Sequence, residues 1–154
     1  MGGSMAAYDS AAMPKRRRGI PASELAARRR RREARHDRFE NLVDQALAGI
    51  PMPFAAALHD VAVVIADEPS PEQRRENGLG ADETLYGLYD GTPRTAWGAD
   101  DVPFPNTITI FRLPLEEDFP DPFDLEDEVR ITVIHELAHH LGIDDDRLEE
   151  LGVD

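Results

Sequence analysis

The sequence has no cysteine and no long apolar run. Without cysteine it forms neither disulfides nor thiolate metal sites, so any metal must be held by His, Asp or Glu. No apolar run approaches the roughly 20 residues of a membrane span. The arginines at 16–18 are followed by Gly19 and Pro21 rather than by an apolar stretch, which excludes secretory and twin-arginine signals. We therefore expect a cytoplasmic protein without a membrane partner.

Positive charge is scarce outside the start of the chain. Residues 1–35 hold ten of the seventeen basic residues and three acidic ones, a net charge of +7, whereas residues 36–154 carry a net charge of −21. We therefore divide the chain into a basic N-terminal arm, residues 1–34, disordered or helical, and one acidic domain, residues 35–154. The acidic domain should repel nucleic acid and attract cations and basic peptides. The arm is expected either to be a solvated face or to make a weak contact with nucleic acid or another anionic partner.

Apolar periodicity predicts an α/β (α+β) fold. Helical spacing occurs between residues 39 and 47. A second helix is predicted to be capped by Asp121, with Pro122 at its first position, or equally well by Asp124, and to end at Gly142. Strand-like runs occupy residues 61–66, 85–89 and 107–112, with a short helical turn at 54–58 and a loop at 68–83. We expect a three- to four-stranded twisted sheet packed on both helices. Residues 107–112, which alternate Thr and Ile, are expected to form the edge strand that borders a peptide-binding cleft.

The most informative segment begins at His135 and includes Glu136 and His139 on the predicted C-terminal helix. At 3.6 residues per turn, His135 and His139 point about 40° apart, so their imidazoles can hold one zinc ion at about 2.0–2.1 Å. Glu136 lies about 100° further around the helix, where it can reach a water molecule instead. This spacing is typical of a zinc site with a glutamate general base. The plain alternative is a surface helix whose histidines face solvent, and His140 points away from the pair in either case.

A third zinc ligand is expected from Asp145. Gly142 permits a left-handed turn that brings the chain back toward the two histidines. Because neighbours in an extended stretch face opposite ways, Asp145 facing inward leaves Asp144 and Asp146 facing outward. We expect Asp146 to cap a terminal helix at residues 147–151. Four nearby carboxylates remain as alternative ligands: Asp144, Asp146, Glu149 and Glu150.

The segment from His135 to Asp145 resembles the zincin signature HExxHxxGxxD of snapalysin-type proteases, whereas metzincins have His at the last position. From about residue 36 to 150 the chain is similar to the bacterial minimal zincin-like metallopeptidase family, short cytoplasmic proteins in which a helix and a small sheet precede the motif helix. The resemblance implies zinc as cofactor, with His135, His139 and Asp145 as ligands and Glu136 as general base. It also implies a peptide or protein substrate.

The expected function is therefore that of a zinc-dependent peptidase, in which a metal-activated water attacks the peptide bond and Glu136 takes its proton. The alternative is a non-catalytic metal-binding or partner-binding zincin-like protein. No Met follows the motif, so a Met-turn is absent. Tyr86 or Tyr89 could stabilise the oxyanion from the sheet, or both could simply be packed.

Overall fold

The computed structural model describes residues 19–91 and 106–152, and contacts divide the chain into two units, before and after the Ala34–Arg35 bond. Helix α1 (Ala22–Ala48) includes the periodic residues 39–47 and also the last part of the arm, which was predicted to be disordered or helical. Its first part is exposed, and its arginines pair with acids one turn away, as in Arg28 with Glu24 at 2.7 Å. Such pairs stabilise a helix by only about 0.2–0.5 kcal/mol each. No helix in the described part of the chain is both long and apolar enough to span a membrane.

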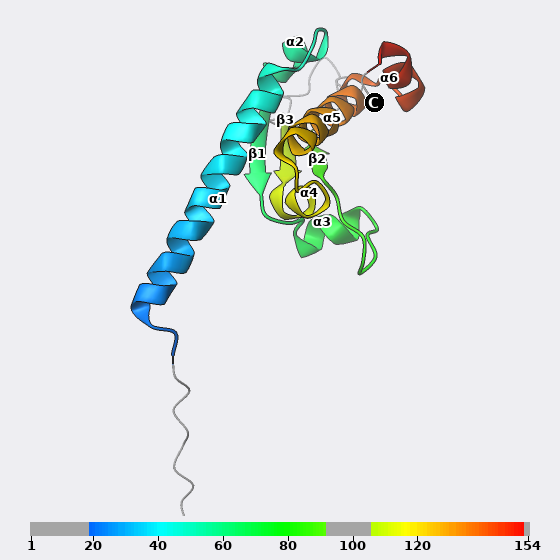
Figure 1. The fold of residues 1–154 in the computed structure, drawn as a ribbon. Coiled ribbons are helices and arrows are strands. Elements are labelled where there is room, and N and C mark those ends of the chain that lie inside the picture. The colour runs from blue at the N-terminus through cyan, green and yellow to red at the C-terminus, as the bar shows by residue number, and fades with distance from the viewer. Residues whose placement is uncertain (1–18, 92–105, 153–154) are drawn as a thin grey trace, which may run out of the picture. The chain divides into compact units, whose positions relative to one another are not determined.

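The unit that starts at Arg35 contains a sheet of three strands in the order β1-β3-β2 (Figure 1). β1 (Val61–Ala66) runs parallel to β3 (Asn106–Phe111), and β2 (Gly87–Asp90) pairs with β3 antiparallel. β3 is thus the central strand, and the prediction that residues 107–112 form the edge strand is wrong. The Thr–Ile alternation correctly indicates one half-exposed face, but it holds no information on what lies beside a strand. The edge next to the motif helix is β2.

The other elements agree with the sequence to different degrees. The 61–66 strand and the helical turn α2 (Phe54–Leu58) are confirmed, while β2 begins two residues later and ends one residue later than predicted. Helix α3 (Pro71–Glu76) lies in the segment predicted as a loop, and a reciprocal capping box starts it. Helix α4 (Arg112–Asp118) follows β3 directly and is absent from the prediction, because Pro114 in the sequence indicates the end of a strand. Proline is in fact well tolerated in the first turn of a helix.

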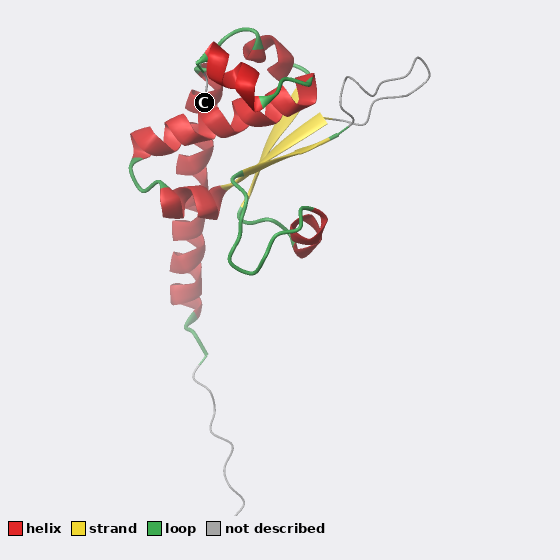
Figure 2. Ribbon diagram, turned by 90° about the vertical axis from the view of Figure 1, so that its right-hand side faces the viewer, coloured by secondary structure: helices red, strands yellow, loops and turns green. Residues whose placement is uncertain are grey.

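Helix α5 (Pro122–Leu141) lies across one face of the sheet (Figure 2). The register places Val63, Ile108 and Tyr89 in one row on this face, and Ile108 is fully buried. The buried side of α1, formed by residues such as Phe39, belongs to the same apolar core. Each fully buried large apolar side chain contributes about 1.5–3 kcal/mol, so this face holds the domain together and fixes α5 on the sheet.

The structure selects Asp121 of the two predicted caps for α5 and confirms Gly142 as its end. The Asp121 carboxylate accepts hydrogen bonds from the first turn, and Gly142 ends the helix with a left-handed φ of 72°. Helix α6 (Asp145–Leu151) follows at once, but Asp144 caps it, accepting from Arg147 N–H at 3.0 Å. The prediction of Asp146 as the cap is therefore wrong by two residues, because the new helix starts earlier than expected.

A buried arginine joins the carboxyl ends of the two parallel strands. Arg112 is only 5% exposed. Its guanidinium donates to Asp67 after β1 at 2.9 Å and to Glu116 one turn along α4 at 2.8 Å. Removing one partner of such a group typically costs about 3–5 kcal/mol, because a charge is left uncompensated. The cluster therefore holds α4 against the sheet at the end opposite the motif.

Gly87 is where the edge strand comes closest to the motif helix. A Cβ built at this position would lie 2.6 Å from Cγ2 of Thr132 and 3.4 Å from the Thr109 carbonyl oxygen. Thr132 is itself buried on α5. The absence of a side chain at Gly87 is therefore what lets β2 and α5 pack in direct contact.

We expect Gly87→Ala to lower the free energy of unfolding by about 1–3 kcal/mol, the usual cost of overpacking. Thr132→Ser removes the methyl group that the new Cβ would meet, so the double variant should recover most of this loss. Urea denaturation measures both. Gly19→Ala, with no atom within 4 Å of the added Cβ, is the matched control. If the double variant is no more stable than Gly87→Ala, the contact with Thr132 is not the cause of the lost stability.

Candidate metal centre

The last two turns of α5 hold four of the residues that matter for chemistry. His135 and Glu136 are half-buried, His139 is exposed and His140 is buried. Because α5 is helical throughout this stretch, His135 and His139 lie on one face, as their spacing requires. Helical geometry places Glu136 and His140 on the neighbouring face, and both contact residues of β2. The helix thus presents two imidazoles beside a carboxylate that is held by the sheet.

Glu136 is held by the backbone of the edge strand. Its Oε2 accepts a hydrogen bond from Tyr89 N–H at 2.9 Å. Phe111 N–H donates to the Tyr86 carbonyl, and in an antiparallel pair the inward and outward residues alternate. The backbone groups of Gly87 and Tyr89 therefore point away from β3, toward an edge that no other strand of the described residues covers. The carboxylate predicted to act as base thus lies at the open edge of the sheet.

His140 lies in the core rather than at the metal face. Its ring packs against that of Tyr89, with centroids 4.8 Å apart and planes inclined by 32°. The Tyr89 hydroxyl donates to Asn106 Oδ1 at 2.6 Å. Burial raises the pKa of Tyr89, and the charge of Asp90 adds to this effect. This packing agrees with the prediction that His140 points away from the histidine pair, and it fixes the strand that Glu136 contacts.

The hydroxyl groups of Tyr86 and Tyr89 donate hydrogen bonds to residues other than His135 and His139. Tyr86 donates to the Asp118 carboxylate, which raises the pKa of Tyr86 to about 12, with smaller contributions from burial and nearby charges. Its ring also packs edge-on against Phe119. The Tyr89 hydroxyl likewise donates to Asn106. Both tyrosines therefore match the alternative in which they are packed and do not stabilise an oxyanion.

The donor chemistry around α5 fits zinc. Two imidazoles four residues apart, one half-buried and one open to solvent, are the pair that a zinc site needs. Asp145 is the first residue of α6, and its side chain lies outside the described part of the structure. Of the alternatives, Asp144 is engaged as the cap of α6 and Glu150 pairs with Arg147. Asp145 stays the predicted third ligand, with Asp146 and Glu149 as the alternatives that these contacts do not engage.

A second group of metal-ligating side chains lies on α1. The ligand atoms of His36, Asp37 and Glu40 lie within 4.8 Å of one another. His36 is half-buried and the two acids are exposed, and His36 and Glu40 approach to 4.0 Å as ordinary neighbours one turn apart. We regard them as a surface pair with an adjacent acid.

A cavity of about 380 Å³ opens beside the motif. It lies between the start of β2 and the outer face of α5 and includes both His135 and Glu136. Glu128, which the sequence reasoning missed, also lines it. Glu128 precedes His135 by seven residues, or two helical turns, so both lie on one face of the helix. This spacing is the sequence signal that could have identified Glu128. The remaining lining residues are Thr84, Leu85, Tyr86, Gly87, Ile131 and Thr132.

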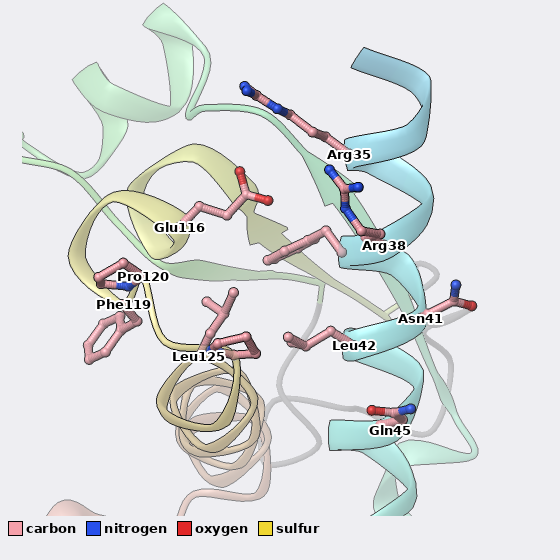
Figure 3. Close-up of a pocket in the computed structure, with 11 residues that line it drawn as sticks. Arg35, Arg38, Asn41, Leu42, Gln45, Glu116, Phe119, Pro120 and Leu125 are labelled. Carbon is pink, nitrogen blue, oxygen red and sulfur yellow. The ribbon is translucent and has the colours of Figure 1, made fainter. Parts of the chain in front are cut away.

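A larger groove of about 610 Å³ lies elsewhere in the same unit. Figure 3 shows Leu42 of α1 and Leu125 of α5 pointing toward each other across it, with Arg35 and Arg38 on the α1 side and Glu116 opposite. Leu125 precedes His135 by ten residues, or about 15 Å of helix. This groove is therefore separate from the motif.

The comparisons with known proteins concern most of the domain. A family model described as zincin-like metallopeptidase matches residues 58–153, more than half of the chain. No curated protein matches. A solved structure of a conserved hypothetical protein from Thermo thermophilus is 28% identical, with a TM-score of 0.45, over 77% of this chain and 99% of that one.

We expect the purified full chain to bind about one zinc ion, and His139→Ala to bind it far more weakly, because one of two imidazole donors is lost. Elemental analysis after dialysis against zinc measures the stoichiometry. His59→Ala, which changes an exposed histidine next to β1, is the control. A wild type that stays metal-free at excess zinc would contradict the site.

The third ligand is tested by two substitutions. Asp145→Ala should weaken zinc binding strongly. Asp144→Ala should leave zinc binding nearly unchanged and cost about 0.5–2 kcal/mol of stability, as loss of a helix cap does. Calorimetric zinc titration and thermal unfolding separate the two effects. If zinc affinity survives Asp145→Ala but collapses in Asp144→Ala or Glu149→Ala, the assignment is wrong.

Proposed function

This chain belongs to the zincin-like metallopeptidase family, and from that premise we propose that it is a zinc-dependent peptidase. The observation that carries the proposal is the position of Glu136. Its carboxylate lies at the open edge of β2, beside the two histidines and in the wall of a cavity. A carboxylate, two histidines and a strand edge thus lie close together, which supports the proposal.

His135 and His139 would hold the zinc ion through their ring nitrogens, with Asp145 as third ligand. Zinc bound there would polarise the substrate carbonyl and lower the pKa of a water molecule toward about 7. His135 also forms part of the cavity wall, so one of the residues that would hold zinc borders the cavity. His139, being exposed, leaves the opposite side open to solvent.

Glu136 would act as general base and then as general acid. Its carboxylate accepts a proton from the attacking water, whose oxygen forms the new bond to the carbonyl carbon. The same proton then passes to the amide nitrogen as the C–N bond breaks, releasing an amine and a carboxylic acid, which loses its remaining proton to water. The hydrogen bond from Tyr89 N–H would orient the carboxylate, since it engages one of the two oxygens.

The open edge of β2 would bind the substrate backbone. The outward-pointing backbone groups of Gly87 and the Tyr89 carbonyl can pair with an extended peptide, while Tyr89 N–H stays on Glu136, so the peptide would join the sheet as a further strand. Such a strand would lie about 4.7–4.9 Å from β2 and run past Glu136. In this proposal β2 is the edge strand that borders the peptide, a role that the sequence had predicted for residues 107–112.

The competing function is a zinc-binding protein without turnover. It shares the metal site and the strand edge, so zinc binding alone does not separate the two. Only the role of Glu136 differs between them, and the decisive measurement therefore targets that carboxylate.

We expect zinc-loaded wild type to cleave members of a peptide library and Glu136→Gln to retain zinc but lose turnover by about 10²–10⁴-fold, the usual contribution of a general base. Mass spectrometry of the products measures cleavage. Glu76→Gln, which changes an exposed carboxylate on α3, is the control. Equal turnover by Glu136→Gln would contradict the mechanism, and a zinc-saturated wild type without turnover would favour the non-catalytic alternative.

A further inference from the structure

The cavity beside the motif has a carboxylate at its far end. Glu128 and His135 are seven residues apart, so they lie about 20° apart around α5 and about 10 Å apart along it. Both line the same cavity of about 380 Å³. Most of the wall between them is apolar or hydroxyl-bearing, from residues such as Leu85, Ile131 and Thr132. The cavity is thus a long space with a negative charge at the end away from the motif.

Glu128 differs from its neighbours on the helix. Glu126 and Asp127 both pair with Arg130, at 3.2 and 2.8 Å. Among the residues that the structure describes, no lysine or arginine forms an ion pair with Glu128. Burial raises the pKa of Glu128, and His135 partly offsets this effect. A carboxylate that is partly desolvated but lacks a fixed cation gains most when a cation enters beside it.

We propose that this cavity is a specificity pocket for a basic side chain next to the cleaved bond of the substrate, and that Glu128 pairs with its cationic end. The inference rests on the proposed function, which places the cleaved bond at Glu136. Lysine and arginine have apolar stems and charged ends, which match the apolar wall and the distant carboxylate. A short polar or an apolar side chain leaves Glu128 without a partner. The excess of acid in residues 36–154 attracts such substrates in addition.

Direct binding tests the pocket without relying on turnover. The zinc-loaded full chain is titrated with Nα-acetyl-lysine amide and with its neutral analogue Nα-acetyl-norleucine amide, while the amide signals of Gly87 and Thr132 are followed by NMR. We expect the lysine compound to bind about tenfold more tightly, as hydrogen bonds to charged groups do. Glu128→Gln should remove this preference, whereas Asp127→Asn, one residue away and outside the cavity, should keep it. Equal binding of both compounds to wild type, or a preference that survives Glu128→Gln, would overturn the proposal.

Cleavage separates this inference from the proposed function. Peptides with Lys or Arg on either side of one bond should show a lower KM than their norleucine counterparts, and Glu128→Gln should raise that KM about tenfold with little change for neutral peptides. Cleavage without any preference for basic residues would overturn the pocket but not the peptidase. A lysine preference in binding, without cleavage of any peptide, would overturn the peptidase but not the pocket.

Discussion

The hydrogen bond from Tyr89 N–H to Glu136 is the interaction on which the site depends. It joins the backbone of the edge strand to the carboxylate that lies between the two histidines in the sequence. The bond requires that β2 and α5 pack without a side chain between them, which Gly87 permits. It also requires that β2 be held in place, and the stacking of Tyr89 on His140 contributes to this. The elements outside the site mainly keep these two elements together.

The features that the sequence predicted are those with strong local signals. The start of α5 at Asp121 and Pro122 and its end at Gly142 follow from capping chemistry, which acts over a few residues. The 61–66 strand follows from an apolar branched run with proline after it. The family match over residues 58–153 agrees with the resemblance drawn from the motif. These inferences succeed because the physical cause lies within the segment itself.

The features that the sequence could not give are set by residues far apart in the chain. The central position of β3 depends on which strands lie beside it, and a strand's own alternation reports only its two faces. The contact of Glu136 with Tyr89 spans 47 positions. Glu128 becomes notable only once the start of β2 closes a cavity over it. Even the Asp144 cap was missed, since three consecutive aspartates offer three similar caps and packing of α6, through Leu148, selects among them.

Tyr89 N–H lies at the edge of the sheet, and no further strand adjoins it in the part of the chain that the structure describes. Its hydrogen can nevertheless exchange with water only when the Glu136 carboxylate moves away, because exchange requires an open hydrogen bond. The rate for this single amide is therefore a measure of how often the carboxylate is released from the strand. A neighbouring edge amide without such an acceptor would exchange at the rate of the exposed backbone. The site thus contains its own isotopic probe of whether its carboxylate is docked on the sheet or turned toward solvent.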